Sequence, residues 1–261
     1  MAPVGAWRTL LRRMGTWGHK ARHVLDDREQ HVRSGLAEPD VDEEPTTLGH
    51  RTYVELSGLL MRGELSPGDK VSLRSLALRL GVSMQPVRQA VDRLVADQAL
   101  EVLPNRAVRV PIMTAARLKE ITTVRLAIEG FAVKQAAKAW TDEDMAAIEM
   151  HDLAFRKECR KRNPDQARAV VENRDLHFSL YRAAQLPSLI PIIEGLWLRI
   201  GPVLNLDMRA SPERLRMGAA ERCHADMVAA YKRRDSRGAR AALEADITGT
   251  AKFIASRGIL P

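Results

Sequence analysis

The chain has 261 residues, of which 45% are hydrophobic and 28% are charged, so it has room for two domains with packed cores. It carries 41 lysines and arginines against 33 aspartates and glutamates, and the net charge of +8 suits a polyanionic partner. Two cysteines, Cys159 and Cys223, are too few for a disulfide framework and indicate a reducing compartment. No apolar run approaches the roughly 18 residues of a membrane-spanning helix, so we expect no contact with a membrane.

Residues 1–47 have the composition of an N-terminal extension, which we expect to be disordered. Residues 38–45 are acidic and rich in proline, a composition typical of disordered chain. Nearer the start, basic residues accompany an apolar set that could form one face of a short amphipathic helix: Trp7, Leu10, Leu11, Met14 and Trp17. The extension lacks the apolar core and cleavage site of a secretory signal. We interpret it as a dispensable tail, or as sequence upstream of the true start codon, rather than as a membrane anchor.

Two amphipathic helices are expected next in the chain. The apolar stripe of the first consists of Tyr53, Leu56, Leu59 and Leu60. A cluster of turn-forming residues over 63–69 ends this helix. Ser72 is placed to cap the second helix by accepting a backbone hydrogen bond. The residues of the second helix that face the core are Leu73, Leu76, Ala77 and Leu80.

The segment from Gly81 to Arg88 has the residue order of a helix-turn-helix motif. Gly81 can take the positive φ that ends one helix, and Ser83 can cap the next with its side chain. Pro86 is tolerated in a first helical turn, where its missing N–H has no intrahelical partner. Arg88 and Arg93 fall away from the apolar face and are free to reach a phosphate or a base edge in the major groove. That apolar face consists of Val87, Val91, Leu94 and Val95.

Two short apolar runs, residues 100–103 and 107–110, follow this helix and are joined by the tip Pro104–Arg106 as a hairpin. Three helices and a hairpin make a winged helix-turn-helix, which we place in residues 48–113. Arg106 at the tip is positioned to contact a phosphate or the minor groove. A lone exposed arginine usually lies on a solvated helix face, but the ordered series of turn, cap, proline and wing favours DNA binding.

Residues 114–261 have apolar spacings typical of helix throughout, and we expect an antiparallel bundle of six or seven helices. The fold is therefore mainly α, with a small β-wing in the N-terminal domain. The expected boundaries in the bundle are Thr141, Pro164, Pro187, a cap at Ser211–Glu213 for a fifth helix running to about Arg234, and Asp235 at the start of the last helix.

A resemblance to the GntR family of bacterial transcription regulators is carried by three segments: Leu65–Asp69, Gly81–Arg88 and Pro104–Arg106. Ala107 departs from the family pattern, which usually has a glycine at this place in the wing. The C-terminal half resembles the effector domain of the FadR subfamily, called FCD. The features that carry this second resemblance are Arg125 with Glu129, Asn173–His177, Leu196–Pro202, His224 and residues 242–247. Together the two resemblances cover about residues 48–257.

The resemblance implies that Arg74 and Arg88 contact operator DNA and that Ser83 touches a phosphate. Met84 stands where the family usually has an arginine that reads a guanine. A methionine can make only apolar contact, for example with a thymine methyl group. Gln85 is a candidate to contact an adenine instead. We therefore expect this protein to bind DNA at a half-site that differs from the usual one of the family.

A candidate metal site follows from the same resemblance. FCD domains commonly hold a divalent metal with a carboxylate and three histidines, and the matching positions here are Asn173, His177, His224 and Asp246. Asn173 and His177 are four residues apart and share a helical face. His224 and Asp246 can lie at similar depth if the last two helices form a hairpin. This set of nitrogen and oxygen ligands suits zinc, nickel or manganese. The alternative is that both histidines are buried without a metal and hydrogen-bond to a helix or to the effector.

Arg125 and Glu129 are also four residues apart, so an ion pair within one helix is the default interpretation, worth about 0.3–0.5 kcal/mol if it is exposed. The resemblance implies instead that Arg125 points into the bundle and binds the carboxylate of a small-molecule effector. FCD regulators typically respond to organic acids, sugar acids or related metabolites. The expected effector-binding residues are Arg125, Glu129, Asn173, His177 and His224.

The sequence thus predicts a bacterial transcription regulator of the cytoplasm, associated with the nucleoid when it is bound to its operator, and not an enzyme. We expect a homodimer on a pseudo-palindromic operator, and a repressor that its effector releases in preference to an activator. One alternative is a DNA-binding dimer whose effector pocket is vestigial or structural. A metal-dependent enzyme is a remote alternative, because no nucleophile–base set, phosphate loop or Cys-x-x-Cys motif accompanies the histidines.

Overall fold

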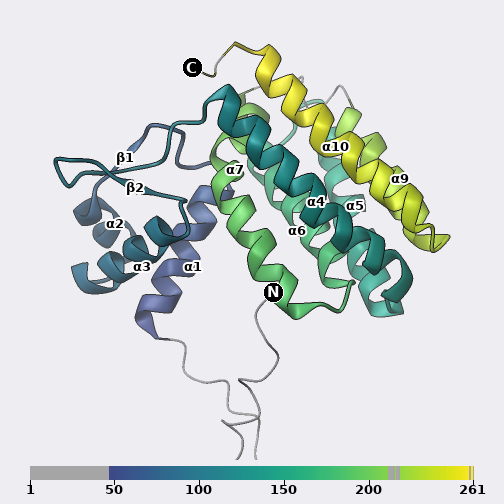
Figure 1. Cartoon of the computed structure of the whole chain (residues 1–261), viewed down its shortest axis with the longest axis horizontal. Coiled ribbons are helices and arrows are strands. Elements are labelled where there is room, and N and C mark those ends of the chain that lie inside the picture. Colours follow the sequence, from purple (N-terminus) through teal and green to yellow (C-terminus); the bar gives the residue numbers. More distant parts are fainter. Residues whose placement is uncertain (1–46, 211–214, 216–217, 259, 261) are drawn as a thin grey trace, which may run out of the picture. The chain divides into compact units, whose positions relative to one another are not determined.

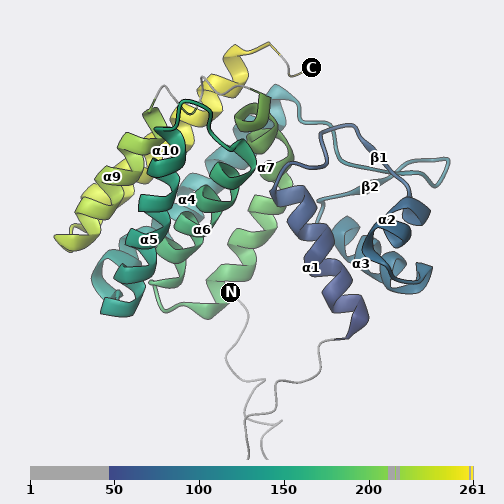
Figure 2. The same cartoon turned by 180° about the vertical axis from the view of Figure 1, so that it is seen from behind.

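The structure is a computed structural model that describes residues 47–210, 215, 218–258 and 260. The extension up to residue 46 and the expected cap at 211–213 lie outside the described residues. The elements, shown from two sides in Figures 1 and 2, are α1 (Leu48–Met61), β1 (Lys70–Val71), α2 (Leu73–Leu80), α3 (Met84–Ala96), β2 (Glu101–Val102), β3 (Val108–Arg109), α4 (Ala115–Ala139), α5 (Asp142–Cys159), α6 (Gln166–Arg182), a 3-10 turn (Pro187–Leu189), α7 (Ile190–Ala210), α9 (Ala219–Lys232) and α10 (Ser236–Ser256).

The winged helix-turn-helix forms as its motifs predict. Thr47 caps α1, and Ser72 caps α2 by accepting a hydrogen bond of 3.3 Å from the N–H of Ser75. Gly81 ends α2 with a φ of +64°, the left-handed conformation expected of it. The three helices bury one hydrophobic cluster, to which the predicted apolar stripes contribute Leu56, Leu59, Leu60, Leu76, Ala77, Val87, Val91 and Leu94.

The small antiparallel sheet contains one strand that the sequence does not reveal. β3 lies in the middle, paired with β2 in the expected hairpin and with β1 on its other side. Val108 of β3 is opposite Val102 of β2 and Val71 of β1. Because β1 is only two residues long, it is too short to show the alternation of polar and apolar residues that marks a strand.

Two side chains near α3 differ from their expected roles. Ser83 occupies the N-cap position, but its hydroxyl makes no capping hydrogen bond in the part of the chain that the structure describes. The residue is exposed, so water can bind the first N–H groups of α3 instead. Arg93 is exposed, but its guanidinium lies over the ring of Tyr53 at 3.8 Å from the ring centre, a contact that the sequence does not reveal. The packing of α1 on α3 brings these two residues together.

The C-terminal half forms the expected helical bundle. A reciprocal capping box between Thr141 and Asp144 starts α5, and Asp235 caps α10. The prediction of one uninterrupted fifth helix from residue 211 is wrong, because Gly218 has a φ of +65° and α9 begins only after it. A residue in the left-handed region cannot continue a right-handed helix. In Figures 1 and 2, α10 lies along both α4 and α9, and contacts join α10 to each of them.

One stretch of the bundle is more apolar than expected. Pro187–Asn205, which includes most of α7, is long and apolar enough to span a membrane, with a mean hydropathy of 1.2. Half of this stretch is buried inside the protein, as in the core helix of a globular domain. Trp197 lies in the core of the bundle, whereas the next residue, Leu198, lies in the core of the winged helix. α7 therefore belongs to both hydrophobic cores.

α1 packs closely against α7 (Figures 1 and 2). Gly201 permits the approach, because a Cβ at this position would lie 3.0 Å from the Cα of Met61 and 3.1 Å from the carbonyl oxygen of Leu60. One turn further along α7, the buried Asn205 side chain donates a hydrogen bond to the carbonyl of Met61. The winged helix and the bundle thus meet through backbone contacts that leave no room for a larger side chain.

Candidate nucleic-acid interface and buried polar cavity

The six residues expected to contact DNA lie at the N-terminal ends of α2 and α3 and at the hairpin tip. Met84 differs from the others, because its side chain is half-buried and packs against the hydrophobic cluster of the winged helix. The other five residues are exposed: Arg74, Ser83, Gln85, Arg88 and Arg106. These five side chains can meet a ligand without any rearrangement of the core.

The hairpin tip takes its shape from Arg106 rather than from Ala107. Arg106 has a φ of +62°, and its N–H donates a hydrogen bond of 2.8 Å to the carbonyl of Leu103. The side chain of Asn105 accepts a hydrogen bond from the N–H of Ala107 at 3.1 Å. Ala107 itself is not among the residues with positive φ, so an alanine fits at this position without backbone strain.

A small cavity of about 30 Å³ lies inside the bundle. Four of the six residues expected to bind effector or metal line its wall: Arg125 from α4, Asn173 and His177 from α6, and Asp246 from α10. The ring of His224 lies next to them, 5.1 Å from that of His177. Ligand atoms of His177, His224 and Asp246 all lie within 4.8 Å of one another. The hairpin of α9 and α10 thus brings residues that are 47 and 69 positions apart in sequence to one point.

His224 is buried next to this wall and packs against the rings of Phe155 and His177. The histidine is fully buried, and its ring packs 4.8 Å from that of Phe155. Neither ring nitrogen of His224 hydrogen-bonds to any residue that the structure describes. A buried imidazole with two unsatisfied nitrogens is costly unless an ion, water or ligand binds it.

Arg125 and Glu129 form the ion pair that their spacing predicts, but the pair is buried rather than exposed. Its Nε and a terminal nitrogen donate to the two carboxylate oxygens of Glu129 at 2.7 and 3.2 Å. Glu129 is fully buried and is not among the residues that line the cavity. Its carboxylate also accepts a hydrogen bond of 2.5 Å from the hydroxyl of Tyr181. Glu129 thus binds the guanidinium of Arg125 but does not itself line the cavity.

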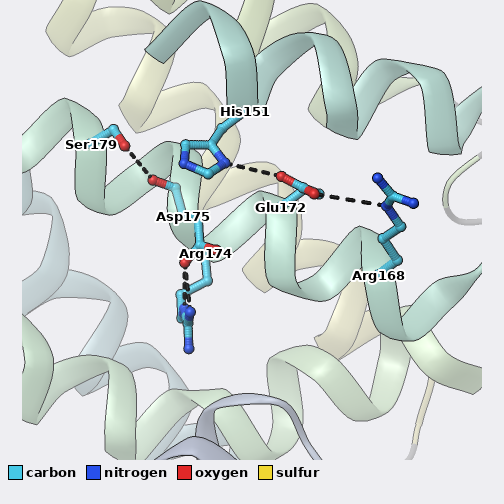
Figure 3. Close-up of polar contacts among 6 residues, drawn as sticks. All are labelled: His151, Arg168, Glu172, Arg174, Asp175 and Ser179. Carbon is cyan, nitrogen blue, oxygen red and sulfur yellow. Dashed lines mark hydrogen bonds and ion pairs between the residues drawn. The ribbon is translucent and has the colours of Figure 1, made fainter. Parts of the chain in front are cut away.

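The intervening residues of the Asn173–His177 segment face away from the cavity. Figure 3 shows Arg174 paired with Asp175, whose carboxylate accepts hydrogen bonds of 2.9 and 2.6 Å, and the hydroxyl of Ser179 bonded to the carbonyl of Asp175. On the neighbouring turn, Glu172 binds Nδ1 of His151 at 3.0 Å. Glu221, which does line the cavity, is paired with Arg160 at 2.5 Å. Asp175, Glu172 and Glu221 are therefore already paired with Arg174, His151 and Arg160.

Comparison with known proteins shows which family the chain belongs to. The family model of bacterial regulatory proteins of the gntR family matches residues 48–110, and the FCD domain matches residues 120–249. The transcriptional regulator McbR of Escherichia coli K12 is 34% identical over 187 residues, which are 71% of this chain and 83% of McbR. The chain belongs to the GntR family. The solved structure of E. coli McbR/YncC matches with a TM-score of 0.74 and 30% identity, over 81% of this chain and 98% of that one.

Other GntR relatives are more distant. The transcriptional repressor RspR of E. coli K12 is 25% identical over 173 residues, which are 66% of this chain and 73% of RspR. A Rhodococcus transcriptional regulator has the same fold, with a TM-score of 0.65 at 17% identity over 80% of this chain and 97% of that one. Because these relatives and the gntR family are transcriptional regulators, the protein is a transcriptional regulator with an FCD domain and not an enzyme.

The charge states in the cavity of this GntR protein follow from burial and neighbouring charges. Burial lowers the pKa of His224 to about 4, so its ring is neutral at pH 7. Burial would raise the pKa of Asp246, but the contact with His177 and the positive charge of Arg125 outweigh burial and lower this pKa. Burial would likewise lower the pKa of Arg125, but Glu129 raises it. Asp246 and Arg125 are therefore both charged.

The donor set fits a divalent metal. Neutral imidazole and carboxylate are ligands of zinc, nickel and manganese. Both ring nitrogens of His224 are unsatisfied, and one of them lies within 4.8 Å of ligand atoms of His177 and Asp246. Hydrogen bonds join His177 to Tyr181 and Tyr181 to Glu129, and neither of the last two residues lines the cavity. The sequence analysis did not single out Tyr181. Its only signal is spacing, because Asn173, His177 and Tyr181 recur every four residues along one face of α6.

Proposed function

We propose that the protein is a GntR regulator of the FadR subfamily that binds a pseudo-palindromic DNA operator as a homodimer in the bacterial cytoplasm. The observation that carries this proposal is the exposure of Arg88 and Gln85 on the first turns of α3, the helix that follows the turn at Gly81. Side chains near the N-terminus of such a helix reach base edges in the major groove, and two chains would read half-sites about one helical turn apart. Arg74, Ser83 and Arg106 would bind phosphates or the minor groove, and Met84 would offer an apolar contact.

The regulation that we propose is release of a repressor from DNA by a small organic acid. Arg125 presents a charged guanidinium at the wall of the cavity, and such a group binds carboxylates strongly. A cavity of about 30 Å³ admits only about two water molecules, so neighbouring side chains must move when an acid enters. That movement would change the affinity for the operator by a coupling of about 1–3 kcal/mol.

We further propose that Asn173, His177, His224 and Asp246 hold a divalent zinc, nickel or manganese ion. The charged side chains Arg125, Glu129 and Asp246 sum to one negative charge, which by itself disfavours an anion. A bound divalent ion would change this sum to one positive charge and provide a direct ligand for a carboxylate. These residues would then bind metal and acid together.

The first experiment tests the DNA-binding part of the proposal. The purified protein is footprinted on the intergenic DNA upstream of its own gene, at several salt concentrations, beside Arg88→Ala and the control Arg233→Ala. Arg233 is an exposed arginine at the end of α9, so the two variants lose the same charge. We expect protection of a short palindrome by the wild type and by Arg233→Ala, and a loss of about 1–3 kcal/mol with Arg88→Ala. Equal, sequence-independent binding by all three proteins would contradict the proposal.

A pocket that binds no effector is the second candidate, because Glu129 already occupies Arg125. Asn173 and Asp246 favour the same alternative, since the family pattern has a carboxylate and a histidine at these places. Thermal unfolding with a panel of small carboxylic acids, with and without zinc, separates the two candidates. An effector raises the unfolding temperature of the wild type but not of Arg125→Ala, which still binds the operator. No response from the wild type to any acid would favour the vestigial pocket.

A further inference from the structure

A chain of hydrogen bonds behind the cavity determines how His177 faces it. The chain runs from Arg125 through Glu129 and Tyr181 to His177, and all four side chains are buried. Its last link joins the Tyr181 hydroxyl to Nδ1 of His177 at 3.0 Å. On the far side of the ring, Nε2 of His177 lies 3.4 Å from a carboxylate oxygen of Asp246.

The direction of each hydrogen bond follows from the charge on Arg125. A guanidinium can only donate, so both oxygens of Glu129 accept from it, and Glu129 is held as a carboxylate. The Tyr181 hydroxyl has one proton, and at 2.5 Å from Glu129 it donates that proton to the carboxylate. The hydroxyl oxygen therefore has only lone pairs to offer to His177.

Nδ1 of His177 must then carry a hydrogen. In the neutral ring one nitrogen is the donor and the other is the acceptor, so a hydrogen on Nδ1 leaves a lone pair on Nε2. In the neutral ring, that lone pair and the Asp246 carboxylate face each other across 3.4 Å, and a metal ion or a proton on Nε2 would relieve this contact between two acceptors.

We infer that Tyr181 and Glu129 are positioning residues that fix His177 in the Nδ1–H tautomer and so aim the lone pair of Nε2 at the metal site. The inference rests on the metal site proposed above and adds two residues that touch neither the metal nor the cavity. Hydrogen bonds of this kind orient a ligating histidine, and losing one typically weakens metal binding by about 10–100-fold.

Tyr181→Phe tests the inference, with Tyr231→Phe as a matched control. Tyr231 is also fully buried in the bundle, but its hydroxyl donates to the carbonyl of Leu180 at 3.0 Å. Zinc affinity is measured on chelator-treated protein by competition with a metal indicator. We expect zinc affinity to fall about 10–100-fold with Tyr181→Phe and to stay unchanged with Tyr231→Phe. An equal loss in both variants would show that packing, rather than the hydrogen bond, is responsible, and would overturn the inference.

A second readout does not depend on metal. In metal-free protein labelled with ¹⁵N at histidine, at a pH where the ring is neutral, the nitrogen shifts report which atom of His177 carries the hydrogen. We expect Nδ1–H in the wild type and a mixture of tautomers in Tyr181→Phe. If the wild type binds no zinc but shows Nδ1–H, the proposed metal site fails and the positioning role stands. A wild-type ring protonated on Nε2 instead would overturn the positioning role, whatever the zinc result.

Glu129→Gln provides a variant with the opposite polarity. The glutamine amide can donate to the Tyr181 hydroxyl, which then donates to Nδ1 of His177. Nδ1 is then the acceptor, so the ring hydrogen is on Nε2. We expect this variant to lose zinc affinity even though Tyr181 is intact. Zinc binding at the wild-type level with Nδ1–H retained would contradict the proposed order of the chain.

Discussion

Two arginine–glutamate pairs of the bundle have the same spacing but lie in opposite environments. Arg125–Glu129 in α4 and Arg240–Glu244 in α10 are both four residues apart, and each has an Nε–Oε1 distance of 2.7 Å. The side chains of the first pair are 6% and 0% exposed, and those of the second 46% and 40%. In the first pair the charges compensate each other inside the protein, whereas in the second water solvates them. The comparison shows that burial, rather than spacing, determines what such a pair contributes.

The largest expected effect tests this comparison directly. Glu129→Ala leaves the buried guanidinium of Arg125 without its carboxylate, so we expect a loss of about 3–5 kcal/mol in the free energy of unfolding. Glu244→Ala breaks the exposed pair and should cost about 0.5 kcal/mol or less. Urea unfolding followed by circular dichroism measures both. Losses of similar size in the two variants would show that the environment of the pairs does not matter.

Two glycines of α7 extend the comparison from charge to space. A Cβ on Gly201 would press on the backbone of α1, whereas a Cβ on Gly195 would meet no atom within 4 Å. We expect Gly201→Ala to destabilise the protein by about 1–3 kcal/mol through this clash. Gly195→Ala should stabilise it by about 0.5–1 kcal/mol, because alanine favours helix. Thermal unfolding distinguishes the two, and a stabilised Gly201→Ala would mean that α1 can move away from α7 at little cost.

The smallest expected effect concerns two serines at helix N-termini. Ser72 accepts a hydrogen bond from the backbone of α2, whereas Ser83 makes no capping bond to α3 in the described chain. Ser72→Ala should therefore cost about 1 kcal/mol and Ser83→Ala less than about 0.5 kcal/mol. Ser83→Ala should weaken operator binding all the same, if this hydroxyl binds a phosphate. A larger stability loss from Ser83→Ala than from Ser72→Ala would contradict the difference in capping.

Local residue order was enough to predict most of the fold. Gly81, Ser72 and the capping residues at Thr141 and Asp235 mark helix ends through backbone chemistry that depends only on their neighbours. The break at Gly218 was missed because a glycine after a polar segment is equally compatible with a helix and with a turn. β1 was missed because two residues have no periodicity, and its pairing with β3 depends on a segment almost forty residues away.

The sequence predicts which residues gather at the candidate metal site, but not which residues hydrogen-bond behind it. His177, His224 and Asp246 were found by their match to a family pattern, and the hairpin of α9 and α10 brings them together. The roles of Glu129 and Tyr181 depend on burial and on hydrogen-bond direction, which no spacing reports. The contact of Arg93 with Tyr53 is a third example, since it arises only from the packing of α1 on α3.

The position of α7 in both cores affects how the protein can be adapted to new ligands. Trp197 lines the cavity and the adjacent Leu198 lies in the winged-helix core, so a substitution that reshapes the cavity from α7 also disturbs the domain that carries α3. Ile247 and Thr250 line the same cavity from α10, which belongs to the bundle core alone. A library for a biosensor with altered ligand preference should therefore vary α10 and keep α7 constant.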